Sequence, residues 1–178
     1  MIVKRFSFAP ENDKNAEFTK FLVKNDIIAA IGHSDGKYQE IKEAVDSGCN
    51  LVTHLYSGCS TITRDHGFRS LGVVETAFLR DELYAEIIAD GKHLPPDLIK
   101  MIIKIKGMDK TILCTDSLEI AGTDIVEGVM SGTEFIVEDG VCKLKDRTAF
   151  AGSVATSDRL IRVMTKECGF SVADSVYM

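Results

Sequence analysis

The chain has 178 residues, of which 45% are hydrophobic and 27% are charged, and its formal net charge is −6 at pH 7. A chain of this size is one ordinary domain that can bury roughly 70% of its unfolded surface, which excludes disordered and fibrous architectures. The modest acidic charge argues against nucleic acid as a main partner, because phosphate neutralisation needs clusters of Lys and Arg that the sequence does not show.

The cysteines and the apolar segments indicate the cellular compartment in which we expect the protein. Its five cysteines are an odd number without a C-x-x-C pair, which is typical of a reduced chain and not of a disulfide framework. No apolar stretch reaches the roughly 20 residues needed to cross a bilayer, and residues 1–10 lack the pattern of a secretory signal. We therefore expect a cytoplasmic protein without a membrane partner.

The predicted elements begin with an alternation of strands and helices. An apolar run over residues 2–8 predicts a strand, and residues 11–25 follow as an amphipathic helix. The second strand is expected over residues 27–31 and the second helix over residues 38–47, where Gly48 ends it.

The same alternation continues along the middle of the chain. Three further apolar runs predict strands, over residues 51–55, 84–89 and 111–115. Between them the sequence predicts a polar loop over residues 56–70 and helices over residues 71–79 and 98–105.

The pattern changes in the last third of the chain. Apolar runs over residues 133–137 and 141–144 flank an Asp-Gly pair, which favours a hairpin with a tight turn. A helix is expected over residues 157–168, and another begins near Ser171.

The order of these elements predicts an α/β protein. Continuous apolar strands linked by helices are typical of a parallel sheet that is covered on both faces. A doubly wound sheet and part of a (β/α)8 barrel both fit, and no glycine fingerprint for a dinucleotide follows the first strand. We prefer the barrel because of the polar residues at the strand ends.

Four predicted strands end, at their carboxyl side, in a histidine or an aspartate, namely His33, His54, His93 and Asp116. This end of a parallel sheet or barrel is where ligands bind, and neighbouring strands lie about 4.8 Å apart, so we expect the four side chains to converge. Imidazole suits zinc and similar divalent ions, and a nearby carboxylate can take up and return a proton. The set predicts a metal-dependent hydrolase.

Each of the four residues also has a structural interpretation. A single histidine at a strand end is commonly a hydrogen-bonded loop residue, and Asp116 before a helix-like segment can be a cap. Because all four stand at the same end of consecutive strands, we favour the functional interpretation.

Five motifs follow one another along the chain: Gly32-His33-Ser34, Thr53-His54-Leu55-Tyr56, Ile88-Ala89-Asp90-Gly91-Lys92-His93, Thr115-Asp116 and Ala151-Gly152-Ser153. Together they resemble the N-acetylglucosamine-6-phosphate deacetylases of the amidohydrolase superfamily, over nearly the whole chain. The resemblance implies a partial (β/α)8 TIM barrel, with about its last five strands and a small β-hairpin insertion, as a single incomplete domain over residues 1–178. It implies a hydrolase that releases acetate from N-acetylglucosamine 6-phosphate and leaves glucosamine 6-phosphate.

The resemblance also implies a role for each motif residue. His33 and His54 become ligands of a divalent metal, with zinc as the first candidate, Asp116 becomes the general base and acid, and His93 contacts the substrate near its acetyl carbonyl. The other implied substrate contacts are Ser57, Gly58, Arg64, Asp90, Gly91, Lys92, Phe150, Ala151 and Gly152.

The loop after the second metal-ligand histidine departs from the family pattern. Ser57-Gly58-Cys59 stands where the family usually has Asn-Ala-Met, so a short hydroxyl replaces an amide that could contact the sugar. The arginine expected to meet the phosphate is displaced as well. We favour Arg64 over Arg69, which lies a few residues further on.

The family's remaining protein ligand to the metal is a glutamate in a His-Leu-Glu-Gly-Pro type segment upstream of the first strand. It has no counterpart in this sequence, since Glu11 matches a different family position. We therefore expect weak metal binding and impaired activity. An open parallel sheet also leaves unpaired edge strands, which predicts a homodimer.

Two other functions stay open. The chain could be another amidohydrolase, such as a deaminase or a cyclic-amide hydrolase, although the Asp-Gly-x-His turn and the Ala-Gly-Ser loop favour the deacetylase. It could also be a catalytically inactive protein that retains affinity for sugar phosphates.

Overall fold

The computed structural model describes residues 2–178. The chain divides into two compact units: unit 1 holds the residues up to Ile87 together with Lys104–Ile112, and unit 2 holds Ile88–Ile103 and Leu113–Met178. Among residues 2–178, no helix combines the length and the apolar character that crossing a membrane requires.

Unit 1 is built on a sheet whose strands take the order β1-β2-β3-β6-β7. The strands span Arg5–Phe8 (β1), Ile28–Ile31 (β2), Leu51–Val52 (β3), Tyr84–Ile88 (β6) and Thr111–Cys114 (β7). The carboxyl ends of β6 and β7 already belong to unit 2. Because β1, β2, β3 and β6 pair in parallel, the predicted α/β class with a parallel sheet is confirmed.

The inner strands are buried on both faces, which is why they read as continuous apolar runs. Ile31, Val52 and Ala85 are 0% exposed. Strand β3 is shorter than the predicted run over residues 51–55, because the backbone turns into the left-handed region at His54, where φ is 33°.

Three helices cover unit 1: α1 (Glu17–Lys24), α2 (Tyr38–Asp46) and α3 (Val73–Leu79). Helix α1 begins later than predicted, because two short 3-10 turns precede it and Asn15 adopts a positive φ of 57°. The carboxylate of Asp13 accepts the backbone N–H groups of Phe18 and Thr19 at 2.8 and 2.9 Å, which satisfies the first turn of the helix.

A short antiparallel hairpin stands where the sequence predicted a polar loop. Its strands are β4 (Thr63–Asp65) and β5 (Phe68–Ser70), joined by His66-Gly67 with φ values of 45° and 89°. Two consecutive positive φ angles are typical of a type I′ turn, and histidine tolerates the left-handed region better than most residues do. The His-Gly pair was therefore a turn signal that the prediction missed.

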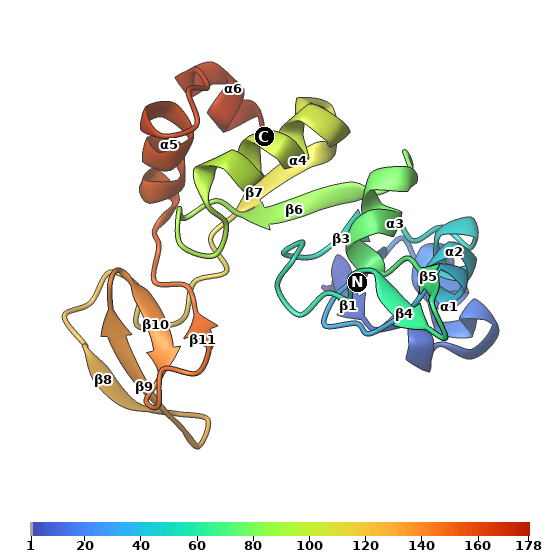
Figure 1. The fold of residues 1–178 in the computed structure, drawn as a ribbon, viewed down its shortest axis with the longest axis horizontal. Helices are drawn as coiled ribbons and strands as arrows, with labels where there is room; N and C mark the ends of the chain where they lie inside the picture. Colours follow the sequence, from blue (N-terminus) through green and yellow to red (C-terminus); the bar gives the residue numbers. More distant parts are fainter. Residues whose placement is uncertain (1) are drawn as a thin grey trace. The chain divides into compact units, whose positions relative to one another are not determined.

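Unit 2 contains a separate antiparallel sheet in the order β11-β10-β9-β8, drawn in shades of orange in Figure 1. The strands span Glu127–Met130 (β8), Thr133–Glu138 (β9), Val141–Leu144 (β10) and Phe150–Gly152 (β11). The predicted hairpin is confirmed as β9–β10, and its turn residues Asp139 and Gly140 have φ values of 54° and 76°. The sheet encloses a small core of Ile120, Phe135 and Cys142.

Helices complete unit 2. They are α5 (Ser157–Lys166), α6 (Val172–Tyr177) and the part of α4 (Pro96–Lys106) that precedes Lys104. Helix α4 begins two residues before the predicted 98–105, and proline occupies its first position, where the N–H that proline lacks would have no partner in any helix.

Candidate functional site

Two histidines meet at the carboxyl ends of neighbouring strands in unit 1. His33 follows Gly32 directly after β2, and His54 follows Thr53 directly after β3. Because β2 and β3 are parallel, both side chains reach the same edge of the sheet. The ring centroids lie 4.7 Å apart, and the ring planes stand at 81° to each other. The structure thus brings together the two residues that were predicted as metal ligands.

The two rings face each other through their Nε2 atoms, which lie 3.1 Å apart. The Nδ1 atom of His54 lies 2.9 Å from the carbonyl oxygen of Ser57. A carbonyl oxygen only accepts hydrogen bonds, so Nδ1 of His54 carries a proton. In the neutral ring, Nε2 of His54 therefore directs a lone pair toward His33.

This arrangement suits two ligands of one divalent ion. Two imidazole nitrogens that bind one zinc tetrahedrally, at about 2.0–2.1 Å each, lie about 3.3 Å apart. The observed 3.1 Å is close to that value, and without an ion it is the length of a hydrogen bond in which Nε2 of His33 donates to Nε2 of His54. Within residues 2–178, no group of three or more His, Cys, Asp or Glu side chains is arranged to hold a metal ion. The pair could therefore supply at most two ligands to a metal ion, and the other positions would need further donors.

A pocket of about 360 Å³ opens beside His33, and its lining comprises His33, Asp35, Tyr56, Gly58 and Cys59. Burial raises the pKa of the Cys59 thiol to about 11. The free thiol is therefore protonated at neutral pH, which makes it a poor nucleophile. The pocket also contains the His33 imidazole and the Asp35 carboxylate, which are suited to binding or acid–base chemistry.

Several hydrogen bonds fix the loop that carries His33. The backbone N–H of Ser34 donates to the carbonyl of Gly58, and the backbone N–H of Ser60 donates to the carbonyl of Ser34, both at 2.9 Å. The Glu11 carboxylate accepts the Ser34 hydroxyl at 2.6 Å and the next backbone N–H at 2.8 Å. Glu11 therefore supports the histidine loop from the segment before α1.

Gly58 packs directly against the His33 ring. Its φ is +58°, and a Cβ atom at this position would lie 2.9 Å from Nδ1 of His33. We expect Gly58→Ala to displace the ring, to weaken zinc binding and to lower the free energy of unfolding by about 1–2 kcal/mol. Competition with a zinc-binding dye and chemical denaturation would measure the two effects.

Gly67→Ala is the matched control for this variant. Gly67 also has a positive φ, of +89°, but a Cβ there would meet nothing within 4 Å. The control variant therefore places a Cβ atom on a left-handed backbone, as Gly58→Ala does, but makes no contact with His33. Equal zinc affinity in the two variants would show that the close packing of Gly58 does not position the imidazole.

The two arginine candidates for a phosphate contact lie opposite each other. Arg64 of β4 and Arg69 of β5 are direct partners in the hairpin register, and both are exposed. Opposite residues of an antiparallel pair project from the same face, and like charges there repel. The structure therefore offers two guanidinium groups on one face, whereas Arg64 alone was predicted as the phosphate contact.

The Asp90 carboxylate organises the turn after β6 in unit 2. Its side chain is 0% exposed. It accepts the backbone N–H groups of Lys92 and His93 at 2.8 Å and lies 2.9 Å from Nδ1 of His93. Burial favours a higher pKa for Asp90, but hydrogen bonds from the His93 side chain and from the backbone of His93 and Lys92 outweigh it and hold the pKa below its usual value.

Strand β11 links the predicted substrate loop to the other site residues of unit 2. The Phe150 ring lies 5.1 Å from the His93 ring, edge to face. Ser153, which follows the strand, forms a β-bridge with Ser117, the residue after Asp116. The strand thus holds one predicted substrate residue against His93 and anchors the loop that carries the predicted general base.

The other predicted site residues are divided between the units. Ser57 lies in the unit 1 loop after His54 and offers its carbonyl to that ring. In unit 2, Gly91 has a φ of 71° and Lys92 is exposed, while Ala151 and Gly152 of β11 are half-buried.

Three site residues share a strained backbone. His33, His54 and Asp116 have φ values of 49°, 33° and 47°. The left-handed region costs a residue with a Cβ atom about 1 kcal/mol or more. Eight other non-glycine residues, among them Ala16, Ser131 and Arg147, adopt it as well, so positive φ does not by itself mark the site. The sequence did not reveal this feature, because a histidine or an aspartate can adopt positive φ but does not require it.

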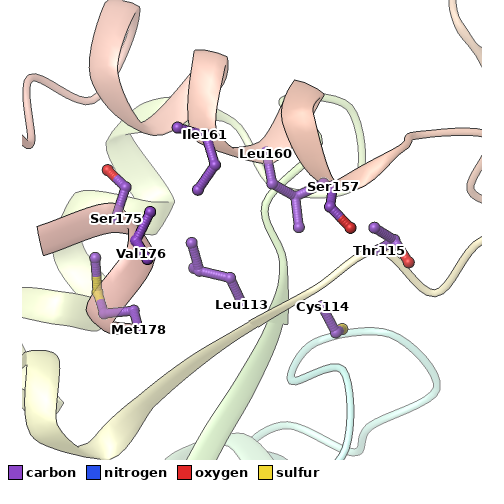
Figure 2. A pocket seen from close by; sticks show the side chains of 9 residues that line it. All are labelled: Leu113, Cys114, Thr115, Ser157, Leu160, Ile161, Ser175, Val176 and Met178. Carbon is purple, nitrogen blue, oxygen red and sulfur yellow. The ribbon is translucent and has the colours of Figure 1, made fainter. Parts of the chain in front are cut away.

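A larger pocket in unit 2, of about 530 Å³, has no histidine, lysine, aspartate or glutamate in its lining. Figure 2 shows its lining, which comes from β7, α5, α6 and the residues beside them: Leu113, Cys114, Thr115, Ser157, Leu160, Ile161, Ser175, Val176 and Met178. These side chains are apolar or carry a hydroxyl, thiol or thioether. The candidate chemistry of unit 2 therefore lies with His93, Asp116 and β11.

Comparison with curated proteins shows similarity along almost the whole chain. The N-acetylglucosamine-6-phosphate deacetylase of Lysinibacillus sphaericus is 30% identical over 176 residues, and that of Bacillus subtilis is 33% identical over 175 residues. An N-acetylgalactosamine-6-phosphate deacetylase of Shewanella is 29% identical over 176 residues. The alignments cover 99%, 97% and 99% of this chain but 44%, 42% and 43% of the relatives, so the chain spans less than half their length. No protein-family model matches the chain.

Solved structures agree with this result. The N-acetylglucosamine-6-phosphate deacetylase of Pasteurella multocida matches with a TM-score of 0.87 and 28% identity, over 98% of this chain and 44% of its own. A mutant of the Mycobacterium smegmatis enzyme, solved in complex with N-acetyl-D-glucosamine-6-phosphate, matches with a TM-score of 0.86 and 25% identity, over 98% of this chain and 45% of its own. The resemblance to this group of proteins is thereby confirmed.

Proposed function

We propose that this chain acts in the hydrolysis of N-acetylglucosamine 6-phosphate to glucosamine 6-phosphate and acetate. One observation carries the proposal: the Nε2 atoms of His33 and His54 meet at 3.1 Å at the ends of neighbouring strands. They do so in a chain that is similar over 97–99% of its length to deacetylases of this substrate.

Each motif residue has a defined task in this proposal. His33 and His54 hold a divalent ion, with zinc as the first candidate, and when bound the ion supplies Lewis-acid polarisation of the acetyl carbonyl and activation of water. Asp116, which is exposed after β7, takes the proton of the attacking water and delivers it to the sugar nitrogen as acetate leaves. His93 and Phe150 bind the acetylated end of the sugar.

The phosphate is assigned to the hairpin β4–β5. Arg64 and Arg69 project from one face of it, and a bound dianion would relieve their mutual repulsion. Guanidinium groups suit phosphate because their planar donors match its oxygens. This assignment keeps Arg64 as the predicted contact and adds Arg69 beside it.

The proposed architecture is part of a (β/α)8 barrel, and residues 1–178 act as one domain within it. The parallel sheet and the TM-scores of 0.86–0.87 to deacetylase structures support this assignment. We further propose a cytoplasmic homodimer without nucleic-acid or membrane partners. Strands β1 and β7, the outermost in the sheet, are the edges that would pair with a second copy.

A second candidate function is binding without turnover. The observation in its favour is the small number of candidate metal ligands. Among residues 2–178, no third His, Cys, Asp or Glu side chain joins the two histidines in a group that could hold a metal ion. Such a protein would bind the amino-sugar phosphate and leave the amide intact.

Acetate release separates these functions. The purified chain, with added zinc, is expected to release acetate from N-acetylglucosamine 6-phosphate at least tenfold faster than from unphosphorylated N-acetylglucosamine. A faster reaction with N-acetylgalactosamine 6-phosphate would assign the activity of the Shewanella relative instead. Thermal stabilisation by glucosamine 6-phosphate without acetate release would establish the binding function, and neither response would overturn both proposals.

A further inference from the structure

The hydrogen bonds of the Asp90 carboxylate show which nitrogen atom of the His93 ring carries a proton. Oδ1 accepts the backbone N–H groups of Lys92 and His93, and Oδ2 lies 2.9 Å from Nδ1 of His93. An ionised carboxylate has no proton to give, so Nδ1 of His93 must donate. The other ring nitrogen, Nε2, has no hydrogen-bond partner among residues 2–178.

Residues of helix α5 also hold the turn that contains Asp90. The Arg159 side chain on α5 donates through Nε to the Asp90 carbonyl at 3.1 Å and through Nη1 to the Gly140 carbonyl at 2.7 Å. Gly91 lies so close to α5 that a Cβ would meet Val163 at 3.3 Å. The geometry of Asp90 and His93 is therefore set by the fold of unit 2 before any ligand binds.

We propose that Asp90 is a positioning residue that holds the proton of the neutral His93 ring on Nδ1, so that Nε2 accepts a hydrogen bond from a donor group of the ligand. On the proposed function, on which this inference rests, that donor is a hydroxyl of the amino sugar or an N–H on its sugar nitrogen, groups that the substrate and glucosamine 6-phosphate both carry. Asp90 itself makes no direct ligand contact, because its carboxylate is enclosed by the turn.

Asp90→Asn tests the proposal without changing the shape of the side chain. The two backbone N–H groups that now meet Oδ1 require an acceptor, so the asparagine oxygen takes that position and its NH2 group faces His93. Nδ1 must then accept, and the proton of the neutral ring moves to Nε2. The same ring would become a donor where it had been an acceptor.

The 15N resonances of the histidine rings report the proton position directly. The chain has four histidines, so single His→Gln variants assign the His93 signals. We expect the proton on Nδ1 in the unmodified chain and on Nε2 in Asp90→Asn. Asp97→Asn is the matched control, because its side chain is 95% exposed and pairs only with Lys100, and it should leave the His93 signals unchanged.

Binding of glucosamine 6-phosphate tests the ligand part of the proposal. We expect Asp90→Asn to weaken this binding about tenfold or more relative to Asp97→Asn, since two donors would then face each other. A proton on Nε2 in the unmodified chain overturns the proposal even if the variant does not fold. A shifted proton with unchanged affinity overturns the donor assignment, whereas failure of acetate release alone overturns only the proposed reaction.

Discussion

Asp116→Asn is expected to lower kcat for acetate release by about 10²–10⁴-fold, the usual contribution of a general acid–base residue. An amide of the same shape cannot take up the proton of the attacking water or return it to the sugar nitrogen. The side chain is exposed, so the substitution should leave the thermal stability unchanged. Steady-state assays of acetate release, with glucosamine 6-phosphate binding measured in parallel, would show a loss of turnover without a loss of affinity.

Asp124→Asn provides the control for this experiment. Asp124 is another exposed aspartate of unit 2, and its substitution makes the same change in charge and shape. It should retain full activity. If Asp116→Asn kept more than a tenth of the turnover of this control, Asp116 would not be the residue that moves the proton.

His54→Ala and His33→Ala are each expected to weaken zinc binding by at least about 100-fold. Residues that merely orient a metal ligand contribute about 10–100-fold to affinity, so the loss of one of two ligands should cost at least as much. His54 is 5% exposed, and its removal can also disturb packing, whereas His33 is exposed. Zinc affinity should be measured by dye competition together with a denaturation curve for each variant.

His66→Ala is the matched control for zinc binding. His66 stands at the turn of the hairpin β4–β5, and its side chain is 93% exposed. It should bind zinc as the unmodified chain does. If His33→Ala and His66→Ala had the same zinc affinity, the pairing of the His33 and His54 rings would have no role in holding the ion.

Most of the parallel sheet could be predicted because buried strands carry a clear signal. The runs over residues 27–31, 84–89 and 111–115 correspond closely to β2, β6 and β7. Strand β3 and the hairpin β4–β5 were harder to predict from the sequence. The left-handed backbone at His54 ends β3 early, and a His-Gly turn joins the two strands of the hairpin. Hydrophobic periodicity reports burial, and it carries no information about single residues with a positive φ.

The candidate site was predicted in part. The meeting of His33 and His54 followed from two neighbouring parallel strands, which the sequence pattern already indicated. The enclosed carboxylate of Asp90 did not follow, because the spacing of Asp90 and His93 reveals neither burial nor which atom receives which proton. The convergence of all four strand-end residues, and the roles of His93 and Asp116, stay predictions.

The left-handed backbone at His33, His54 and Asp116 also has an evolutionary consequence. Glycine at these positions would relieve the strain, because it has no Cβ atom that disfavours the left-handed region. This chain instead carries imidazole or carboxylate at all three places. Positive φ also occurs at Ala16 and Arg147, which have no proposed chemical role, so the angle alone is no mark of selection. At the three site positions the proposed chemistry is what would keep a histidine or an aspartate in place of glycine, at a small loss of stability.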